Sequence, residues 1–251
     1  MPAATLLIPD PVPAMMKTSR PDLVAGGRRP LSRAEFAALT ADATVLSQDE
    51  HGLKVIQRPD GRIIKLFRRN RWLSSALLDP YAVRFARASL RLEQLGIQAC
   101  KIESLFRVPH LHRDAVVYPR IEGVELRQAL QRPGRRDELM PSLAGFVARL
   151  HCRGVYYRGL HFANVLLRNE GDFALLDVSE TRFFRNGLTP RYRARNFRPM
   201  IKYKEDRAAM AAYGPLRFVQ EYLGESELSE ARQDVFVRAL RSMHDLFRVR
   251  S

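Results

Sequence analysis

Apolar residues recur at helical spacing in the second half of the chain. One stripe follows the order i, i+3, i+4 and i+7, which predicts an amphipathic helix packed on a core. Its members are Leu143, Phe146, Val147 and Leu150. Gly154 comes soon after this stripe and is expected to end the helix. Two short runs that are mainly apolar follow at 165–167 and 173–178, with polar residues and a glycine between them. These runs predict a tight β-hairpin.

The first half of the chain has short apolar segments that are typical of strands. A capping box, in which Ser32 is followed three residues later by Glu35, predicts a short helix to about Leu39. A Pro-Asp-Gly sequence at 59–61 predicts a turn, and a longer helix is expected over 81–95. The strand-like segments lie at 44–46, 53–56, 62–67 and 115–118.

Together these elements predict an α+β protein. Strands and one long helix occupy the first part of the chain, and helices are expected again at about 204–223 and 229–247. We therefore expect three parts: a mobile tail with a short helix over 1–40, a small β-rich lobe over 41–118, and a helical lobe over 119–251.

Composition is that of a globular protein. Of the residues, 46% are apolar, and no uninterrupted apolar run reaches the about 18 residues that a membrane-spanning helix needs. The only two cysteines, Cys100 and Cys152, argue against a disulfide scaffold or a structural zinc site. The cytoplasm is the expected compartment.

The charge is strongly positive. Forty-two Lys and Arg residues against 27 Asp and Glu residues give a net charge of +15, which indicates an anionic partner: nucleic acid, an anionic bilayer or a phosphorylated substrate. Arginine dominates the densest stretch, and its planar fork suits phosphate. The alternative is a solvated basic face. The stretch contains Arg182, Arg185, Arg191, Arg193, Arg195, Arg198, Lys202, Lys204 and Arg207.

The polar segment between the predicted helix and the hairpin is the most informative. Residues 157–164 read Tyr-Arg-Gly-Leu-His-Phe-Ala-Asn, in the place of the kinase catalytic loop H-R-D-L-x-x-x-N. Asn164 and Asp177 then fall on the two magnesium-ligand positions, and a tight hairpin would hold them close together. Such an oxygen pair suits Mg²⁺, which takes its other ligands from phosphates and water. The alternative for each residue alone is structural: Asn164 satisfies loop backbone groups, and Asp177 ends a strand.

A lysine lies within one of the predicted strands. Alternation over 62–67 places Ile63, Lys65 and Phe67 on one face. In a kinase, a lysine at this position holds the α- and β-phosphates of the nucleotide. The alternative is an edge-strand lysine that faces water.

With these motifs, the chain resembles the lipopolysaccharide kinase family, the Kdo and heptose kinases of the outer-membrane core, which have the two-lobed protein-kinase-like fold. It is most similar to the branch described as toluene tolerance proteins in Gram-negative bacteria. The resemblance covers about residues 45–207. It rests on GRIIKLFR at 61–68, PYAVRF at 80–85, YYRGLHFANVL at 156–166 and RARNFR at 193–198.

The resemblance implies ATP, Mg²⁺ and an anionic glycolipid or phosphorylated sugar acceptor, at the inner face of the cytoplasmic membrane. Carried over by position, Lys65 would hold nucleotide phosphates, and Asn164 and Asp177 would bind both nucleotide and Mg²⁺. His161 stands where small-molecule kinases of this fold often carry His, and His161 and Arg158 are the candidate catalytic residues. The candidate acceptor-binding residues are Arg182, Arg193, Arg195 and Arg198.

Gly159 occupies the position of the usual catalytic Asp, so the general base is missing. Catalysis of phosphoryl transfer is mainly positioning and electrostatic stabilisation. ATP-dependent transfer to the lipopolysaccharide core or a related envelope glycolipid is therefore still the expected function. The alternative is a catalytically inactive pseudokinase scaffold that binds an anionic lipid or an envelope-synthesis partner. Nucleic-acid binding comes third and predicts aromatic residues interleaved with the basic stretch. These are Phe183, Phe184, Tyr192, Phe197 and Tyr203.

Overall fold

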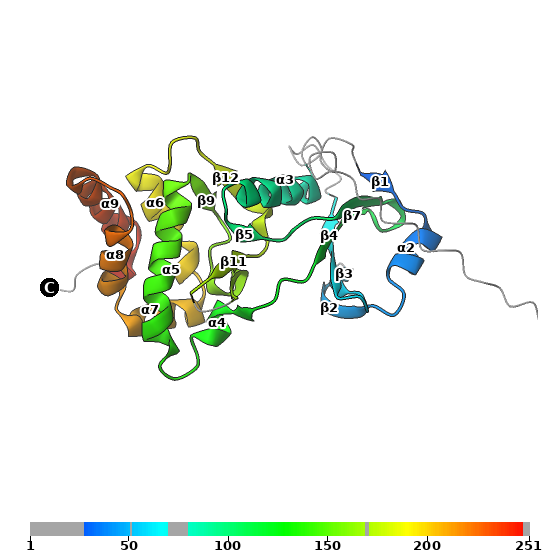
Figure 1. Cartoon of the computed structure of the whole chain (residues 1–251), viewed down its shortest axis with the longest axis horizontal. Coiled ribbons are helices and arrows are strands. Elements are labelled where there is room, and N and C mark those ends of the chain that lie inside the picture. Colours follow the sequence, from blue (N-terminus) through cyan, green and yellow to red (C-terminus); the bar gives the residue numbers. More distant parts are fainter. Residues whose placement is uncertain (1–27, 51, 70–79, 169–170, 248–251) are drawn as a thin grey trace, which may run out of the picture. The chain divides into compact units, whose positions relative to one another are not determined.

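The computed structural model describes residues 28–50, 52–69, 80–168 and 171–247, and the chain divides into two compact units (Figure 1). The first unit contains the chain up to Ala86 together with Lys101–Arg120, and the second contains Arg87–Cys100 and the chain from Ile121 onward. Residues 87–100 therefore interrupt the lobe that was expected to be continuous over 41–118. The tail expected within 1–40 falls largely on residues 1–27, outside the described part.

The first unit is built on a six-stranded sheet with the order β1-β6-β7-β4-β3-β2. Its strands pair antiparallel, except that β1 runs parallel to β6. The strands are β1 (Arg29–Pro30), β2 (Thr44–Asp49), β3 (Gly52–Gln57), β4 (Arg62–Arg68), β6 (Ser104–Val108) and β7 (Arg113–Pro119). Sequence patterning predicted β2, β3, β4 and β7. It missed β1 and β6, which are short and do not alternate regularly.

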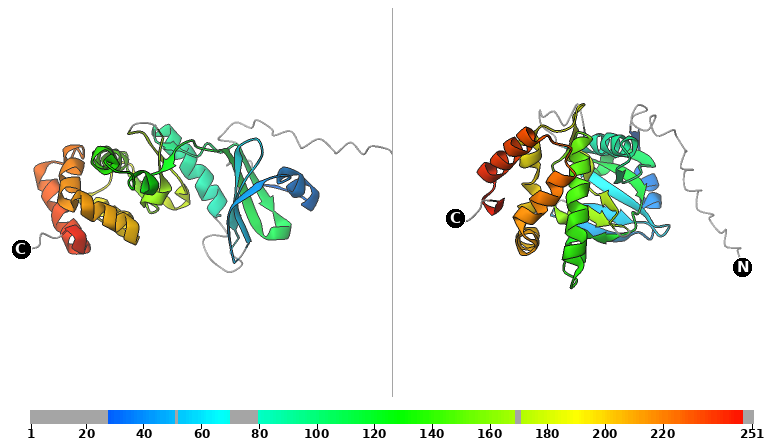
Figure 2. Two further views of the ribbon diagram at one scale, coloured as in Figure 1. Left: turned by 90° about the horizontal axis from the view of Figure 1, so that it is seen from below. Right: turned by 60° about the vertical axis from the view of Figure 1, so that its left-hand side comes forward.

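Helix α2 (Arg33–Leu39) confirms the predicted capping box. The Glu35 backbone N–H donates to the Ser32 hydroxyl at 3.1 Å, and the Ser32 backbone N–H donates to the Glu35 carboxylate at 2.8 Å. The helix lies beside the sheet (Figure 2) and buries two apolar side chains in a core formed with the sheet. This core consists of Leu31, Phe36, Leu39, Ile56, Ile64, Leu66, Val108, Ala115 and Val117. Ile64 and Leu66 share one face of β4, as alternation predicted.

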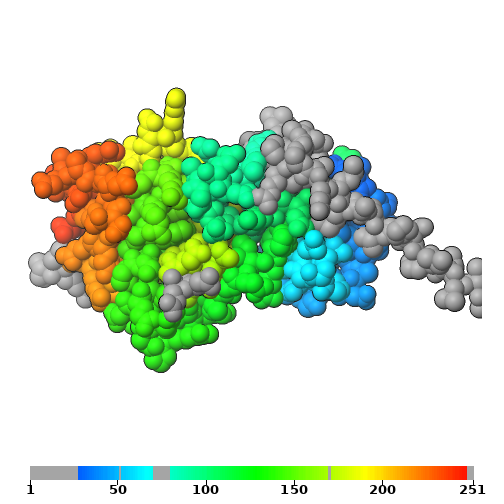
Figure 3. Space-filling model, viewed as in Figure 1, coloured from blue at the N-terminus to red at the C-terminus, as the bar shows by residue number. Residues whose placement is uncertain are grey.

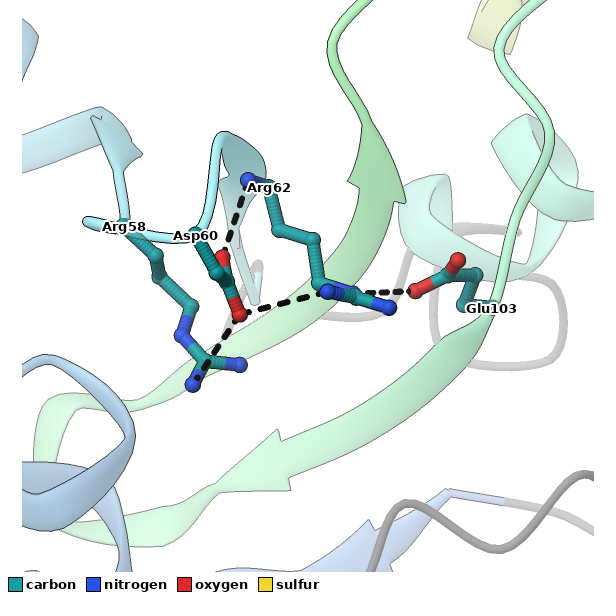
Figure 4. A network of polar contacts seen from close by, with 4 residues as sticks. All are labelled: Arg58, Asp60, Arg62 and Glu103. Carbon is teal, nitrogen blue, oxygen red and sulfur yellow. Dashed lines mark hydrogen bonds and ion pairs between the residues drawn. The ribbon is translucent and has the colours of Figure 1, made fainter.

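The predicted Pro-Asp-Gly turn between β3 and β4 is present, and charged side chains stabilise it through hydrogen bonds and ion pairs (Figure 4). The Asp60 carboxylate accepts from the Arg62 backbone N–H at 3.0 Å. The same carboxylate lies 3.3 Å from the guanidinium groups of both Arg58 and Arg62. Arg62 Nε also donates to Glu103 at 2.7 Å. The network thus connects the turn to the segment that leads into β6.

The second unit is mainly helical and contains two small sheets, with the orders β5-β11-β10-β8 and β12-β9. Its strands are β5 (Gln98–Ala99), β8 (Val124–Glu125), β9 (Val155–Tyr157), β10 (Val165–Leu167), β11 (Phe173–Leu175) and β12 (Thr181–Phe183). Its helices are α4 (Leu126–Ala129), α5 (Arg135–Cys152), α6 (Pro190–Asn196), α7 (Lys204–Tyr213), α8 (Pro215–Gly224) and α9 (Glu230–Met243). Helix α3 (Tyr81–Gln94) crosses the division between the units. Among the helices that the structure describes, none has both the length and the apolar character needed to cross a bilayer.

Helix α5 contains the predicted apolar stripe, all of it buried, and begins at Arg135, before the first residue of the stripe. Gly154 follows the helix with φ 75°, and a Cβ on it would lie 2.0 Å from the backbone oxygen of Phe184. Only glycine fits there. The single helix expected over 204–223 was wrong, because Gly214 and Pro215 divide it into α7 and α8. The strand expected to reach residue 178 ends at Leu175.

Candidate functional site

The loop between β9 and β10 is held at both ends by buried polar side chains. At its start, the Tyr157 backbone N–H donates to the Asn196 side chain at 3.1 Å, and the Asn196 amide donates back to the Tyr157 carbonyl at 2.8 Å. At its end, the Phe162 backbone N–H donates to Asp206 at 3.1 Å. Asp206 is 0% exposed and pairs with Arg127 through bonds of 2.7 and 3.1 Å. Side chains from α4, α6 and α7 therefore set the loop conformation.

The predicted hairpin brings Asn164 beside the strand end that precedes Asp177. Val165 pairs with Leu175, and the Leu176 backbone N–H donates to the Asn164 carbonyl at 2.8 Å. Asp177 is exposed and adopts a left-handed conformation (φ 47°, ψ 54°), which is uncommon for a residue other than glycine. This conformation ends the extended chain and starts a 3₁₀ turn, η3 (Val178–Glu180).

The buried side chain of Tyr157 contacts both Asn164 and the backbone just before Asp177. Its hydroxyl donates to the Leu176 carbonyl and is hydrogen-bonded with the Asn164 side chain. Asn164 Nδ2 in turn donates to the Gly159 carbonyl at 3.2 Å. Burial first, and then the negative charge of Asp177, hold the pKa of Tyr157 well above its usual value. The phenol is therefore a neutral hydrogen-bond donor that orients the loop, and it is not a base at neutral pH.

The side chain of Tyr157 also fills the space next to Gly159. A Cβ placed on Gly159 would lie 2.8 Å from Cε2 of the Tyr157 ring and 2.9 Å from both Cζ and the hydroxyl. Tyr157 is 0% exposed, so the ring has no open space to move into. Gly159 has no left-handed φ. The need for glycine at this position is steric, and a carboxylate at residue 159 requires a different neighbour at residue 157.

His161 is half-buried in the middle of the loop. Its ring lies edge-on to Tyr203, with the centroids 4.9 Å apart, and its Nδ1 has no hydrogen-bond partner among the residues that the structure describes. Burial is the main cause that lowers the pKa of His161; the charge of Asp206 opposes the shift, and those of Arg127 and Lys202 add to it. The imidazole is consequently neutral at pH 7, the form that accepts a proton.

Two further candidates are Arg158, in the same loop, and Lys65, on β4. Arg158 is exposed at the start of the loop and 3.7 Å from Glu180, a surface contact that contributes little to stability. Lys65 belongs to the first unit, on β4. Its Nζ lies 5.3 Å from the ring centroid of Phe67 and 5.1 Å from that of Phe85, both within cation–π range.

The four candidate acceptor-binding arginines differ in exposure. Three of them are exposed: Arg182, Arg195 and Arg198. Arg193 is only 4% exposed; its Nε donates to the Leu188 carbonyl at 2.9 Å and its Nη1 to the Ser226 carbonyl at 2.8 Å. The guanidinium that was expected to bind the acceptor is therefore already engaged by main-chain carbonyls. Arg193 holds α6 to the chain that follows α8.

The side-chain oxygens of Asn164 and Asp177 are the pair that could hold a metal ion. One amide and one carboxylate suit Mg²⁺ that arrives with phosphate and keeps several waters. Ser179 donates to the Asp177 carboxylate at 3.3 Å, a long bond that a stronger ligand of the carboxylate can replace. In the described part of the chain, no group of three or more His, Cys, Asp or Glu residues could hold a metal ion.

Sequence reasoning missed Asp206, Arg127 and Asn196, which hold the loop. One signal for Asp206 was present. The buried residues of α7 are Asp206, Met210 and Tyr213, at i, i+4 and i+7, so an acidic residue occupies an apolar stripe. A carboxylate in such a position is almost always paired. Nothing in the spacing of Asn196 and Arg127 distinguishes them from exposed polar residues.

A scan of protein-family models found no match to this chain, and a search of curated proteins found none either. The resemblance to the lipopolysaccharide kinases therefore rests on the sequence motifs, and the activity it implies is a proposal.

Proposed function

We propose that this protein is a kinase-like phosphotransferase with the two-lobed protein-kinase-like fold. It transfers a phosphoryl group from ATP to a hydroxyl of the lipopolysaccharide core or a related envelope glycolipid. The observation that carries the proposal is the hairpin register that sets Asn164 beside the strand end leading to Asp177. The loop before it is anchored to Asp206. This order of loop, metal-ligand amide and metal-ligand carboxylate is that of the kinase site.

In this proposal, Asn164 and Asp177 hold Mg²⁺ and the nucleotide phosphates, and Lys65 holds the α- and β-phosphates. When bound, the ion supplies charge neutralisation on the phosphates. Asp206 and Asn196 keep the loop in one conformation, so that Asn164 loses little freedom on binding. The buried Tyr157 side chain is hydrogen-bonded with Asn164 and helps to hold it in place.

The proton of the acceptor hydroxyl needs another destination, because residue 159 is glycine. His161 is the candidate base. Burial lowers the pKa of its imidazole, so the side chain is neutral at pH 7 and can accept a proton. Arg158 stands beside it, exposed, and is the candidate for pairing with phosphate. A general base contributes about 10²–10⁴-fold, so a poorly placed one slows such an enzyme without abolishing turnover.

The proposed acceptor is an anionic glycolipid or phosphorylated sugar, and Arg182, Arg195 and Arg198 are its candidate ligands. The proposed place of action is the cytoplasmic side of the inner membrane. A second candidate function is a pseudokinase scaffold. It is favoured by the packing of Tyr157 against Gly159, which leaves no room for a carboxylate where kinases carry their base.

The decisive experiment measures ATP binding with and without Mg²⁺ for the wild type and Asp177→Asn. Asparagine tolerates the left-handed conformation of residue 177 and removes the charge, so the fold is kept. We expect the variant to lose the Mg²⁺-dependent part of the affinity. Asp172→Asn, an exposed acid of the same hairpin, is the matched control and should behave as wild type. An unchanged Mg²⁺ dependence in Asp177→Asn would contradict the assignment.

A second measurement separates the enzyme from the scaffold. Wild type that binds Mg²⁺ and ATP is incubated with lipopolysaccharide core acceptor, and phosphate transfer to the acceptor is followed. Transfer supports the phosphotransferase. Nucleotide binding without transfer supports the scaffold.

A further inference from the structure

Residues 181–204 carry no acidic side chain. This segment runs through β12, α6 and a 3₁₀ turn, η4 (Pro199–Ile201), to the start of α7. It contains eight basic residues, of which Arg193 is buried. The other seven are exposed, and we call them the basic face: Arg182, Arg185, Arg191, Arg195, Arg198, Lys202 and Lys204. None of the seven forms an ion pair with another residue that the structure describes.

Four members of the basic face lie in one row, at i, i+4, i+7 and i+11: Arg191, Arg195, Arg198 and Lys202. The backbone stays right-handed from α6 through η4 to Lys202, so this spacing keeps the row on one side. The opposite side of this segment carries the buried residues, which are Ala194, Phe197, Met200 and Ile201. Like charges at this spacing destabilise a helix, so the row opposes folding unless it has an anionic partner. In Figure 3 the yellow atoms of this part of the chain lie at the surface, and some project outward.

Aromatic rings accompany the basic face. β12 pairs with β9, which sets Arg182 opposite Tyr156. Tyr156 lies edge-on to Tyr192 with the centroids 5.6 Å apart, and Phe184 packs on Tyr192 at 5.0 Å. Tyr192 keeps 38% of its surface exposed. Tyrosine with an apolar body and a polar tip is the side chain enriched where hydrocarbon meets headgroups.

The aromatic residues interleaved with the basic residues are poorly suited to stacking on bases, which needs a free ring face. Phe197 is 0% exposed. Tyr203 has the charged groups of Arg127 and Lys202 over its ring at 5.1 and 5.3 Å. Tyr192 is packed by two other rings. Phe197, Tyr203 and Tyr192 thus have partners within the protein on the ring faces that stacking on a nucleic acid would need.

We propose that the basic face docks the protein on an anionic lipid bilayer, with Tyr156 and Tyr192 at the level of the headgroups. The arginine row supplies charge that an anionic leaflet attracts, and the tyrosine pair supplies interfacial contact. This docking does not require phosphoryl transfer. An inactive scaffold would use it equally, so its test is independent of nucleotide binding.

The test is co-sedimentation of the full chain with two kinds of vesicle, one of phosphatidylcholine alone and one that also contains phosphatidylglycerol. We expect binding to the anionic vesicles only, and weaker binding as salt is raised. Each Lys or Arg near an anionic surface contributes about fivefold in binding. The variant Arg191→Gln/Arg195→Gln/Arg198→Gln should therefore bind on the order of 100-fold more weakly.

Two matched variants control for charge and fold. Arg33→Gln/Arg91→Gln/Arg132→Gln removes the same charge from exposed positions outside the basic face and should keep most of the binding. Arg191→Lys/Arg195→Lys/Arg198→Lys keeps the charge and should bind as wild type. If the triple Gln variant does not fold, as judged by its thermal melt, the pair Arg182→Gln/Arg185→Gln at β12 replaces it, with an expected loss of about 25-fold.

Three results would overturn the proposal. The first is equal binding to neutral vesicles, and the second is an equal loss in the control triple variant. The third is tighter binding to a single-stranded oligonucleotide than to anionic vesicles, abolished by the Gln substitutions, which would make the basic face a nucleic-acid surface. Asp177→Asn, which should lose the Mg²⁺-dependent part of the ATP affinity, should leave vesicle binding unchanged.

Discussion

Tyr157 and Gly159 behave as one steric unit in the candidate loop. The Tyr157 ring is fully buried, and its hydroxyl donates a hydrogen bond to the Leu176 carbonyl. Gly159, two residues later, leaves room for the ring. A protein interior is packed densely enough that a side chain added at residue 159 meets this ring at once. The missing carboxylate and the bulky residue 157 are therefore a single difference from the kinase pattern.

Substituting Gly159 tests this coupling. We expect Gly159→Asp to lower the free energy of unfolding by about 1–3 kcal/mol, the usual cost of overpacking, and to leave phosphoryl transfer without a gain. Gly159→Ala adds the same Cβ and should lose a similar amount, as measured by urea unfolding. Tyr157→His/Gly159→Asp should recover stability relative to Gly159→Asp and is the variant in which a carboxylate can raise turnover. Full stability of Gly159→Asp alone would show that the ring moves freely.

At the scale of elements, the Arg127–Asp206 pair joins α4, α7 and the candidate loop. Asp206 lies in the first turn of α7, where the helix dipole favours negative charge, and it accepts from both Arg127 and the Phe162 backbone. The two partners differ in burial, since the Arg127 side chain is 25% exposed and that of Asp206 is 0% exposed. The loop therefore depends on a fully buried charge that one arginine neutralises.

This asymmetry predicts unequal effects of breaking the pair. Arg127→Met leaves a buried carboxylate without its counter-ion and should cost about 3 kcal/mol of unfolding free energy. Asp206→Asn should cost less, because the freed guanidinium reaches water and the Asn carbonyl still accepts from Phe162. The double variant should lose less unfolding free energy than the two single variants lose together. A double-mutant cycle in urea measures this difference. Equal single losses that add would contradict the pairing.

The second unit as a whole encloses a fully buried histidine, His151, on α5. His151 is 0% exposed; its Nδ1 lies 2.9 Å from the Tyr222 hydroxyl and its Nε2 lies 3.3 Å from Asn196 Oδ1. Burial, reinforced by the charge of Arg193, lowers the pKa of His151 to about 3. The folded protein thus resists a proton that the unfolded chain takes up near pH 6.5.

Stability should therefore fall in mild acid. The contribution of His151 is fully present above pH 6.5 and is lost as pH falls towards 3, because the lowered pKa belongs to the folded state. Between pH 7 and pH 5 this group alone should remove about 2 kcal/mol of unfolding free energy. His161 and His244, whose pKa values burial also lowers, act in the same direction. Urea unfolding at both pH values measures the change, and His151→Gln should show a shallower pH dependence than wild type. An identical slope in the variant would exclude His151 as the source.

Local chemistry was readable from the sequence. The capping box of α2, the turn at 59–61, the apolar stripe of α5 and the hairpin that follows the loop all depend on residues a few positions apart. Their spacing carries the information, because turns, caps and helix faces are local structures. The division of 204–223 at Gly214 and Pro215 is equally local, because a Gly-Pro dipeptide is itself a signal for a break between helices.

The sequence by itself determined the mixed α+β class, most of the longer elements and the pairing of Asn164 with the strand that leads to Asp177. Only the tertiary structure decided which polar residues are buried. Arg193 looked like a ligand for anions and instead binds main-chain carbonyls. Asp206 and Asn196 had no role predicted from the sequence, and both hold the loop. Their partners lie tens of residues away in sequence, and a buried polar group is stable only where the folded chain brings a partner to it.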